Sequence, residues 1–133
     1  MPIELEMTLR ILLAAALGAI LGYQRERAGK LVGLRTHILI CVGAALFTVA
    51  SLYGFGAVAD PARVAAGIVV GIGFLGGGAI IRTGEGIIAG LTTAATIWVV
   101  AAIGLAAGAG LYLASAVVTA IALIVLLLPH PIR

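Results

Sequence analysis

The sequence predicts an all-α membrane protein, a bundle of about five transmembrane helices. Of its 133 residues, 63% are hydrophobic and only 10% are charged. A soluble domain typically carries ~25% charged residues, so this chain has too little polar surface to coat a water-soluble globule. The mean hydropathy of +1.29 points the same way, and the apolar residues form successive long runs.

Five apolar runs mark the expected spans. A transmembrane helix needs about 20 predominantly apolar residues, with a range of roughly 17–25. Asp60 followed by Pro61 provides a helix start for the third run, and the short connections RTGEG and AGAG make the last three spans antiparallel neighbours. Within a single domain, residues 1–133, the runs lie at residues 7–23, 36–53, 61–81, 87–107 and 111–128.

The first run does not resemble a cleaved signal peptide, although Arg10 interrupts it. A signal peptide has a basic leader and a cleavage site of small residues. Here the leader MPIELEM is acidic, and the basic segment QRERAGK follows the run. We therefore expect the first run to remain as a span.

The basic residues gather on one side of the predicted bundle. Arg25, Arg27, Lys30 and Arg35 lie between the first two spans, Arg82 follows the third and Arg133 follows the fifth. The acidic residues Glu4, Glu6 and Asp60 fall on the other side. Cytoplasmic loops carry the excess of Lys and Arg in membrane proteins. We therefore predict an outside N-terminus and a cytoplasmic C-terminus.

The segment GIGFLG at residues 71–76 matches the G-x-G-x-x-G pattern of dinucleotide-binding sites. That site needs a preceding strand and an acidic residue about 20 positions later, whereas here an apolar run surrounds the glycines and no Asp or Glu follows Glu85. We interpret the glycines as helix-packing residues, because small residues four apart let membrane helices approach closely. The glycines given this role are Gly18, Gly22, Gly67, Gly71, Gly73, Gly76, Gly77, Gly90, Gly104 and Gly108.

The three consecutive glycines at 76–78 leave two interpretations open. They can serve close packing, or they can let the third span bend or break, as the discontinuous helices of transporters do.

Polar residues lie near the predicted membrane boundaries. Arg35 and His37 open the second span, where they either reach the headgroups or form an inward-facing cluster with Glu26, Arg82 and Glu85. Thr92 and Thr93 either bond the backbone of their own helix or a neighbouring helix, or they contact a substrate. Asp60 and Arg63 are expected to form a charged pair at the outer surface.

No acidic residue lies near the middle of a predicted span, where ion pumps and transporters place ionisable groups. The sequence has no Walker motif, catalytic-triad spacing or metal-ligand cluster. We expect no enzymatic activity, no cofactor, no metal site and no nucleic-acid partner. One carboxylate, Asp60, makes a poor Mg²⁺ site.

Three stretches resemble the MgtC/SapB family of bacterial inner-membrane proteins: QRERAGKLVGLRTHILICVGAALF, DPARVAAGIVVGIGFLGGGAIIR and GLTTAATIWVVAAIGLAAGAG. The matching residues are Arg25, Glu26, Gly33, Leu34, Arg35, Thr36 and His37, then Asp60, Pro61, Arg63, Gly71, Gly73, Phe74, Leu75 and Gly76, then Gly90, Leu91, Thr92, Thr93 and Ala94. With Arg82 and Glu85, the polar members of these stretches are the candidate site residues.

The resemblance implies a multi-pass protein of the bacterial inner membrane. It also implies a role in magnesium limitation, acid stress or virulence, with partner membrane proteins such as the proton-translocating ATP synthase. Two positions depart from the family. Gly67 stands where the family usually has glutamine and Val70 where it has a small hydroxyl residue, which weakens the case for a polar site on that helix. Better-known members also carry a soluble C-terminal domain, so this chain is either a membrane domain alone or a short SapB-like member.

Our leading hypothesis is a non-enzymatic regulator or accessory protein that contacts itself or a membrane partner through glycine-lined faces. The alternative is a small oligomeric transporter or channel for Mg²⁺ or another small solute. A third hypothesis is a purely structural, lipid-organising protein.

Overall fold

The structure is a computed structural model that describes residues 2–56, 58, 60–82 and 87–129, with only the backbone for residues 81, 82 and 87–89. It confirms the predicted fold class, since the described residues form five helices and no strand. The helices are α1 (Ile3–Arg27), α2 (Leu34–Tyr53), α3 (Ala62–Arg82), α4 (Ile87–Gly108) and α5 (Tyr112–Leu126).

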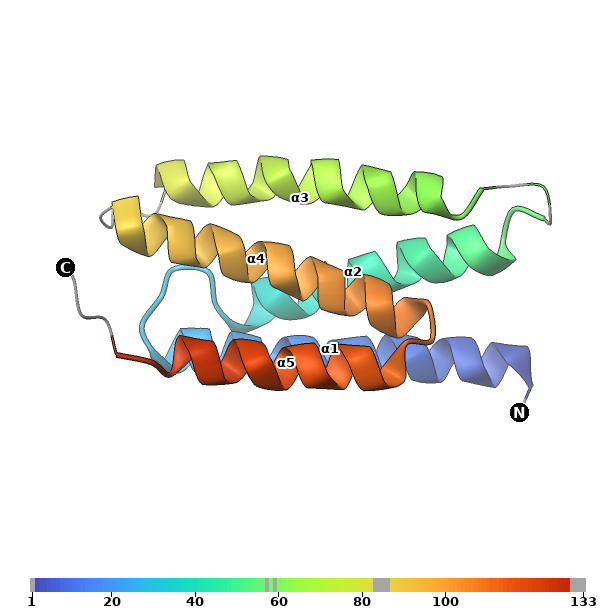
Figure 1. Ribbon diagram of the computed structural model, residues 1–133, viewed down its shortest axis with the longest axis horizontal. Helices are drawn as coiled ribbons and strands as arrows, with labels where there is room; N and C mark the ends of the chain where they lie inside the picture. The colour runs from blue at the N-terminus through green and yellow to red at the C-terminus, as the bar shows by residue number, and fades with distance from the viewer. Residues whose placement is uncertain (1, 57, 59, 83–86, 130–133) are drawn as a thin grey trace.

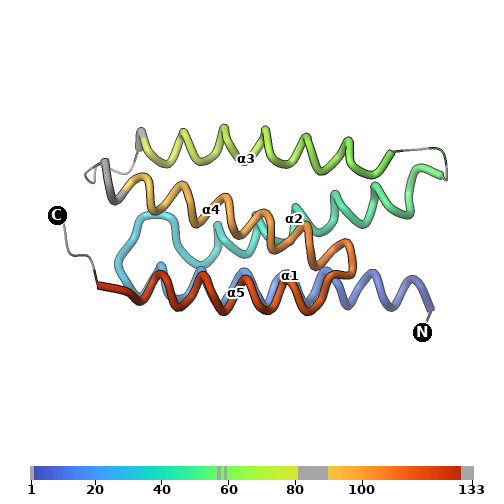
Figure 2. Tube along the Cα trace, viewed as in Figure 1, coloured from blue at the N-terminus to red at the C-terminus, as the bar shows by residue number. Residues whose placement is uncertain are grey.

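The five helices lie side by side, each antiparallel to the next in the chain (Figure 1). α3 runs along one edge of the bundle and α1 with α5 along the other, while α2 and α4 lie between them. The tube view shows that α1 ends and α2 begins at the same end of the bundle as the last turns of α3 and α5 (Figure 2). We call this the basic end, because it carries Arg25, Arg27, Lys30 and Arg35.

Helix lengths differ from the predicted spans at the first and last elements. α1 has 25 residues, because polar residues extend it past the apolar run: Glu4 and Glu6 occupy its first turn, Arg25 and Arg27 its last. Acidic residues at the start and basic residues at the end of a helix interact favourably with its dipole and stabilise it. Four helices of the described chain are long and apolar enough to cross a membrane. α5 has only 15 residues, about 22 Å at 1.5 Å per residue.

Glycines bring α1 and α4 against α2. A Cβ added to Gly18 would lie 2.8 Å from the Cβ of Cys41, and one added to Gly22 would lie 2.9 Å from the Cα of Leu34. On the other side of α2, a Cβ on Gly108 would lie 2.6 Å from the carbonyl oxygen of Ala45, and one on Gly104 would collide with the carbonyl of Cys41. Only glycine permits these backbone approaches. The core that results contains Leu21, Cys41, Ala45, Val100 and Ile103, all 1% exposed or less.

The glycines of α3 behave differently. A Cβ added to Gly67, Gly71, Gly73 or Gly77 would meet no described atom within 4 Å, so these residues make no close helix contact with the part of the chain that the structure describes. Gly76 faces α4, where an added Cβ would lie 3.5 Å from the Cβ of Ala94. α3 continues through residues 76–78 as one helix, so the third span is not broken there.

Candidate functional site

The basic end encloses a buried polar cluster built by three helices, which we call the inner cluster: Arg25 of α1, His37 of α2 and Thr93 of α4. Their side chains are 3%, 0% and 1% exposed. The guanidinium of Arg25 donates a hydrogen bond to the Thr93 hydroxyl, with 3.3 Å between Nη2 and Oγ1. The protein thus buries the charge of Arg25 inside a bundle whose helices are long enough to cross a membrane. Burying a charge there costs free energy unless polar groups solvate it.

Spacing along α1 and α2 explains how His37 reaches this position. Gly18 and Gly22 are one turn apart, and they face Cys41 and His37, which are also one turn apart on the antiparallel helix. A Cβ on Gly22 would lie 3.0 Å from the Cβ of His37. The missing side chains of α1 therefore leave room for the imidazole.

The hydrogen bonds of His37 define its tautomer. Its Nδ1 lies 2.8 Å from the carbonyl oxygen of Gly33. A carbonyl oxygen only accepts, so Nδ1 carries the proton, and Nε2 of the neutral ring is an acceptor. Nε2 is buried and has no hydrogen-bond partner among the described residues. His37 thus presents an unused acceptor inside the bundle.

The connection before α2 is held by Glu26. Its Oε1 accepts a hydrogen bond of 3.1 Å from the backbone amide of Leu34, which satisfies a free amide at the start of α2. A Cβ on Gly33 would lie 2.7 Å from this carboxylate oxygen, so glycine makes room for the cap. Arg35 and Thr36 are exposed beside it. The structure therefore supports only part of the predicted inward-facing cluster. His37 is buried together with Arg25, whereas Glu26 and Arg35 lie at the surface.

The remaining predicted residues at this end are described to different degrees. Thr92 is partly buried on α4, and its carbonyl accepts a hydrogen bond from the Thr96 hydroxyl at 2.8 Å. Gly90 is buried at the start of the same helix. Arg82 ends α3 with its side chain outside the described part, and Glu85 lies outside the described residues.

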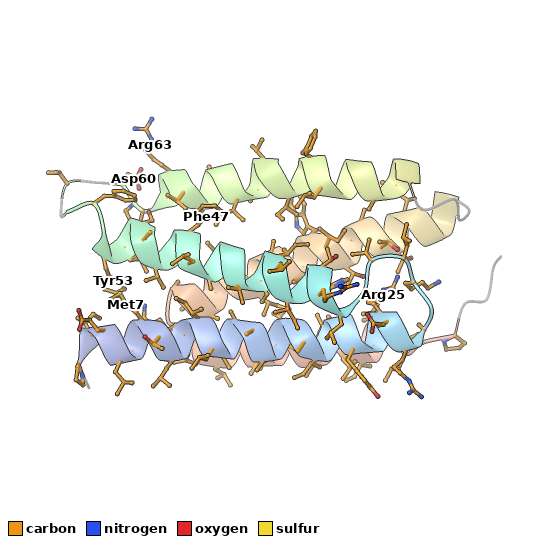
Figure 3. All side chains as sticks on the ribbon, turned by 180° about the vertical axis from the view of Figure 1, so that it is seen from behind. Met7, Arg25, Phe47, Tyr53, Asp60 and Arg63 are labelled. Carbon is orange, nitrogen blue, oxygen red and sulfur yellow. The ribbon has the colours of Figure 1, made fainter. Side chains whose placement is uncertain are left out.

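The opposite end of the bundle holds Asp60 and Arg63. Asp60 caps α3 as predicted, since its Oδ1 accepts a hydrogen bond of 3.0 Å from the amide of Ala62. The predicted charged pair is wrong. Arg63 is exposed and extends away from the bundle (Figure 3), and the ion pair recorded among described residues is Glu6–Arg10. Water can solvate both side chains there, so neither requires the other.

Arg10, which sequence reasoning treated only as an interruption, forms a second buried polar cluster. It is 7% exposed. Its Nε donates to the Tyr112 hydroxyl at 3.1 Å, its Nη1 donates to the Gly108 carbonyl at 3.0 Å, and its Nη2 pairs with Glu6. The guanidinium also lies 5.4 Å from the centre of the Tyr53 ring, within cation–π range. A charged residue in an apolar run was the available signal.

The buried charges share one sign. Among described residues the buried charged side chains are Arg10 and Arg25, whereas Glu4, Glu26 and Asp60 are exposed and Glu6 is partly exposed. Among the described side chains, no group of three or more His, Cys, Asp or Glu could hold a metal. Mg²⁺ prefers carboxylate and other oxygen ligands. The charged side chains buried in the described interior are therefore both cationic.

α3 presents an open apolar face. Val70 is 75% exposed and Phe74 is 83% exposed, one turn apart. Towards α2, the helix borders a groove of about 670 Å³ lined by Thr36 and by apolar and glycine residues, including Gly43, Gly67 and Gly71. Of the four candidate membrane spans, α3 is the least buried: only 17% of its most apolar 18-residue segment is buried inside the bundle.

These features define a multi-pass helical membrane protein with two buried arginine clusters and one loosely covered helix. The chain belongs to the MgtC family, whose family model matches residues 11–133, as the sequence motifs indicated. Relatives include "Putative magnesium transporter YhiD" of Escherichia coli (strain K12), 46% identical over 114 residues that cover 80% of this chain and 53% of the relative.

Two further relatives are similar over comparable lengths. "Protein MgtC" of Brucella abortus (strain 2308) is 46% identical over 119 residues, covering 90% of this chain and 49% of the relative. "Protein SrpB" of Synechococcus elongatus is 39% identical over 112 residues, covering 75% and 62%. The chain thus spans about half the length of the relatives named MgtC and YhiD. These names denote no enzymatic activity, and no solved structure matches the chain.

Proposed function

We propose that this chain is a non-enzymatic regulator or accessory protein of the bacterial inner membrane, acting in magnesium limitation, acid stress or virulence by binding a membrane partner. The observation that carries the proposal is the open face of α3. Val70 and Phe74 form a ridge on it, and Gly73 and Gly77 leave open space beside the ridge. A ridge beside a glycine surface can interlock with a second helix.

The distribution of glycines supports a partner rather than internal packing. α2 packs directly against Gly18, Gly22, Gly104 and Gly108, whereas a Cβ added to Gly73 or Gly77 would meet no described atom within 4 Å. In lipid, helices associate through close packing of small residues rather than through a hydrophobic force. The open glycines of α3 are therefore suited to contact between molecules. A subunit of ATP synthase is the partner class that the family resemblance implies, and a second copy is the alternative.

Capture of ATP synthase subunits from detergent-solubilised membranes tests this proposal. Gly73→Leu, which places a bulky side chain on the proposed contact face, should reduce capture at least severalfold. The matched control is Ala116→Leu on α5, an exposed position on the edge of the bundle away from α3 (Figure 1). Undiminished capture by Gly73→Leu, or equal loss in both variants, would overturn the proposal.

The printed name of the YhiD relative favours a second candidate, a magnesium transporter. Magnesium flux into liposomes containing the purified chain separates the two functions. The buried arginines and the absence of acidic ligands in the described interior predict no flux above that of empty liposomes. Flux that Asp60→Ala abolishes would establish the transporter in place of the regulator.

A further inference from the structure

α1 and α5 form a groove at the basic end, on the edge of the bundle away from α3. We call it the α1–α5 groove. It has a volume of about 820 Å³, and its lining includes Ile20, Tyr23, Gln24 and Arg27 of α1 with Leu123 and Leu127 near the end of α5. The volume is within the range of ~300–1,000 Å³ typical of small-molecule sites.

The lining changes character along the groove. Ile20 and Leu123 make its inner part apolar, and Arg27 lies at the last residue of α1. The guanidinium of Arg27 lies 5.9 Å from the centre of the Tyr23 ring, which holds it over the groove wall. Tyrosine and arginine at a helix end are typical of the membrane–water interface. The groove is therefore apolar along its inner part and carries a positive charge at the end where the membrane–water interface is expected.

The two helices lie against each other, with a polar contact at this mouth. Nε2 of Gln24 donates to the backbone carbonyl of Leu126 at 3.5 Å, a long hydrogen bond at the C-terminal end of α5. Arg27 is exposed and forms no ion pair with any residue the structure describes. Its guanidinium fork is thus available to an anion, and such a fork suits the bidentate recognition of phosphate.

We propose that the α1–α5 groove binds an anionic phospholipid from the leaflet at the basic end. The phosphate contacts Arg27, and an acyl chain lies between Ile20 and Leu123. From residue 19 to residue 27 the groove wall of α1 measures about 12 Å at 1.5 Å per residue, and one leaflet of hydrocarbon is about 15 Å deep. The groove therefore matches the reach of one lipid from its headgroup towards the middle of the bilayer.

Charge favours a lipid over a second copy of the chain. Two copies in one membrane share an orientation, so their basic ends, each with Arg25, Arg27, Lys30 and Arg35, would meet at the same level. Like charges at one interface oppose such pairing. An apolar partner helix would cover Arg27 without neutralising it, whereas an anionic headgroup supplies the opposite charge.

Native mass spectrometry of the detergent-purified full chain, titrated with dioleoyl phosphatidylglycerol or dioleoyl phosphatidylcholine, tests this inference. The wild-type chain should retain phosphatidylglycerol about fivefold more tightly, the effect of one basic residue near an anionic lipid surface. Arg27→Gln should reduce that preference to near unity. Lys30→Gln removes the same charge from the same end outside the groove lining and should keep it.

A substitution in the apolar part of the α1–α5 groove provides an independent test of lipid binding. Ala19→Trp should fill the groove and lower retention of both lipids, while circular dichroism confirms that the variant stays helical. Equal retention of the two lipids by the wild type, or equal loss in Arg27→Gln and Lys30→Gln, would overturn the proposal. A dimer abolished by Ala19→Trp would assign the groove to a second copy instead. Arg27→Gln should leave capture of a protein partner through α3 unchanged. Failure of the lipid proposal can therefore be distinguished from failure of the proposed contact with a membrane partner.

Discussion

Arg25 of α1 donates a hydrogen bond to the hydroxyl of Thr93 of α4, 3.3 Å away and 68 residues later in the chain. Both side chains are almost fully buried. The two residues belong to separate sequence motifs, and the fold brings them together beside His37. The motifs therefore meet in one polar cluster inside the bundle.

The first prediction concerns this contact. Thr93→Val keeps the shape of the side chain but removes the acceptor, and it should lower the free energy of unfolding by about 1–2 kcal/mol, since the donor is charged. Thr96→Val is the control, because that hydroxyl bonds the carbonyl of Thr92 on its own helix. Reversible unfolding in mixed detergent measures both. An equal or smaller effect for Thr93→Val would contradict the assigned role.

The second prediction concerns the glycines of α1. Gly22→Ala should destabilise the fold by about 1–3 kcal/mol, a typical cost of overpacking, because the new Cβ would meet the Leu34 backbone at 2.9 Å. The new Cβ of Gly77→Ala on α3 meets no described atom within 4 Å, so this substitution should be neutral or stabilising by up to about 1 kcal/mol, the difference in helix propensity. Melting temperatures in detergent compare the two. A tolerated Gly22→Ala would show that α1 and α2 can separate without cost.

The third prediction concerns the second buried arginine. Arg10→Met leaves the buried carbonyl of Gly108 without its donor and should cost about 1–3 kcal/mol. Limited proteolysis should then cut faster at the connection between α4 and α5, which Arg10 holds against α1. Arg63→Met removes an exposed arginine and should change stability by no more than about 0.5 kcal/mol. Unchanged proteolysis in Arg10→Met would refute the holding role.

The sequence was sufficient to predict the helices, because long apolar runs and short connections leave few alternatives, and its three polar and glycine-rich motifs indicated the family. It was not sufficient to tell which glycines face inward. Gly18 with Gly22 and Gly73 with Gly77 have the same spacing, yet the first pair is packed and the second is open. A bundle in lipid is apolar on both its inner and outer sides, so hydrophobic periodicity does not distinguish a packed face from an open one.

The burial of Arg10 was beyond reach of local sequence patterns for a different reason. Its partners Gly108 and Tyr112 lie 98 and 102 residues away in the chain. A pattern within one span shows a charge in an apolar run, but it does not show the carbonyl and hydroxyl that solvate the charge. His37 is a comparable case, because its burial depends on Gly22 of another helix.

The outward face of α3 is the proposed contact surface for another protein. Photocrosslinking in cells grown at low magnesium tests it most directly, with benzoylphenylalanine in place of Phe74. Leu113 of α5, which is 77% exposed, supplies the control position facing lipid. We predict a discrete crosslinked protein band containing an ATP synthase subunit from position 74 and none from position 113. Crosslinks to lipid alone from both positions would contradict the claim.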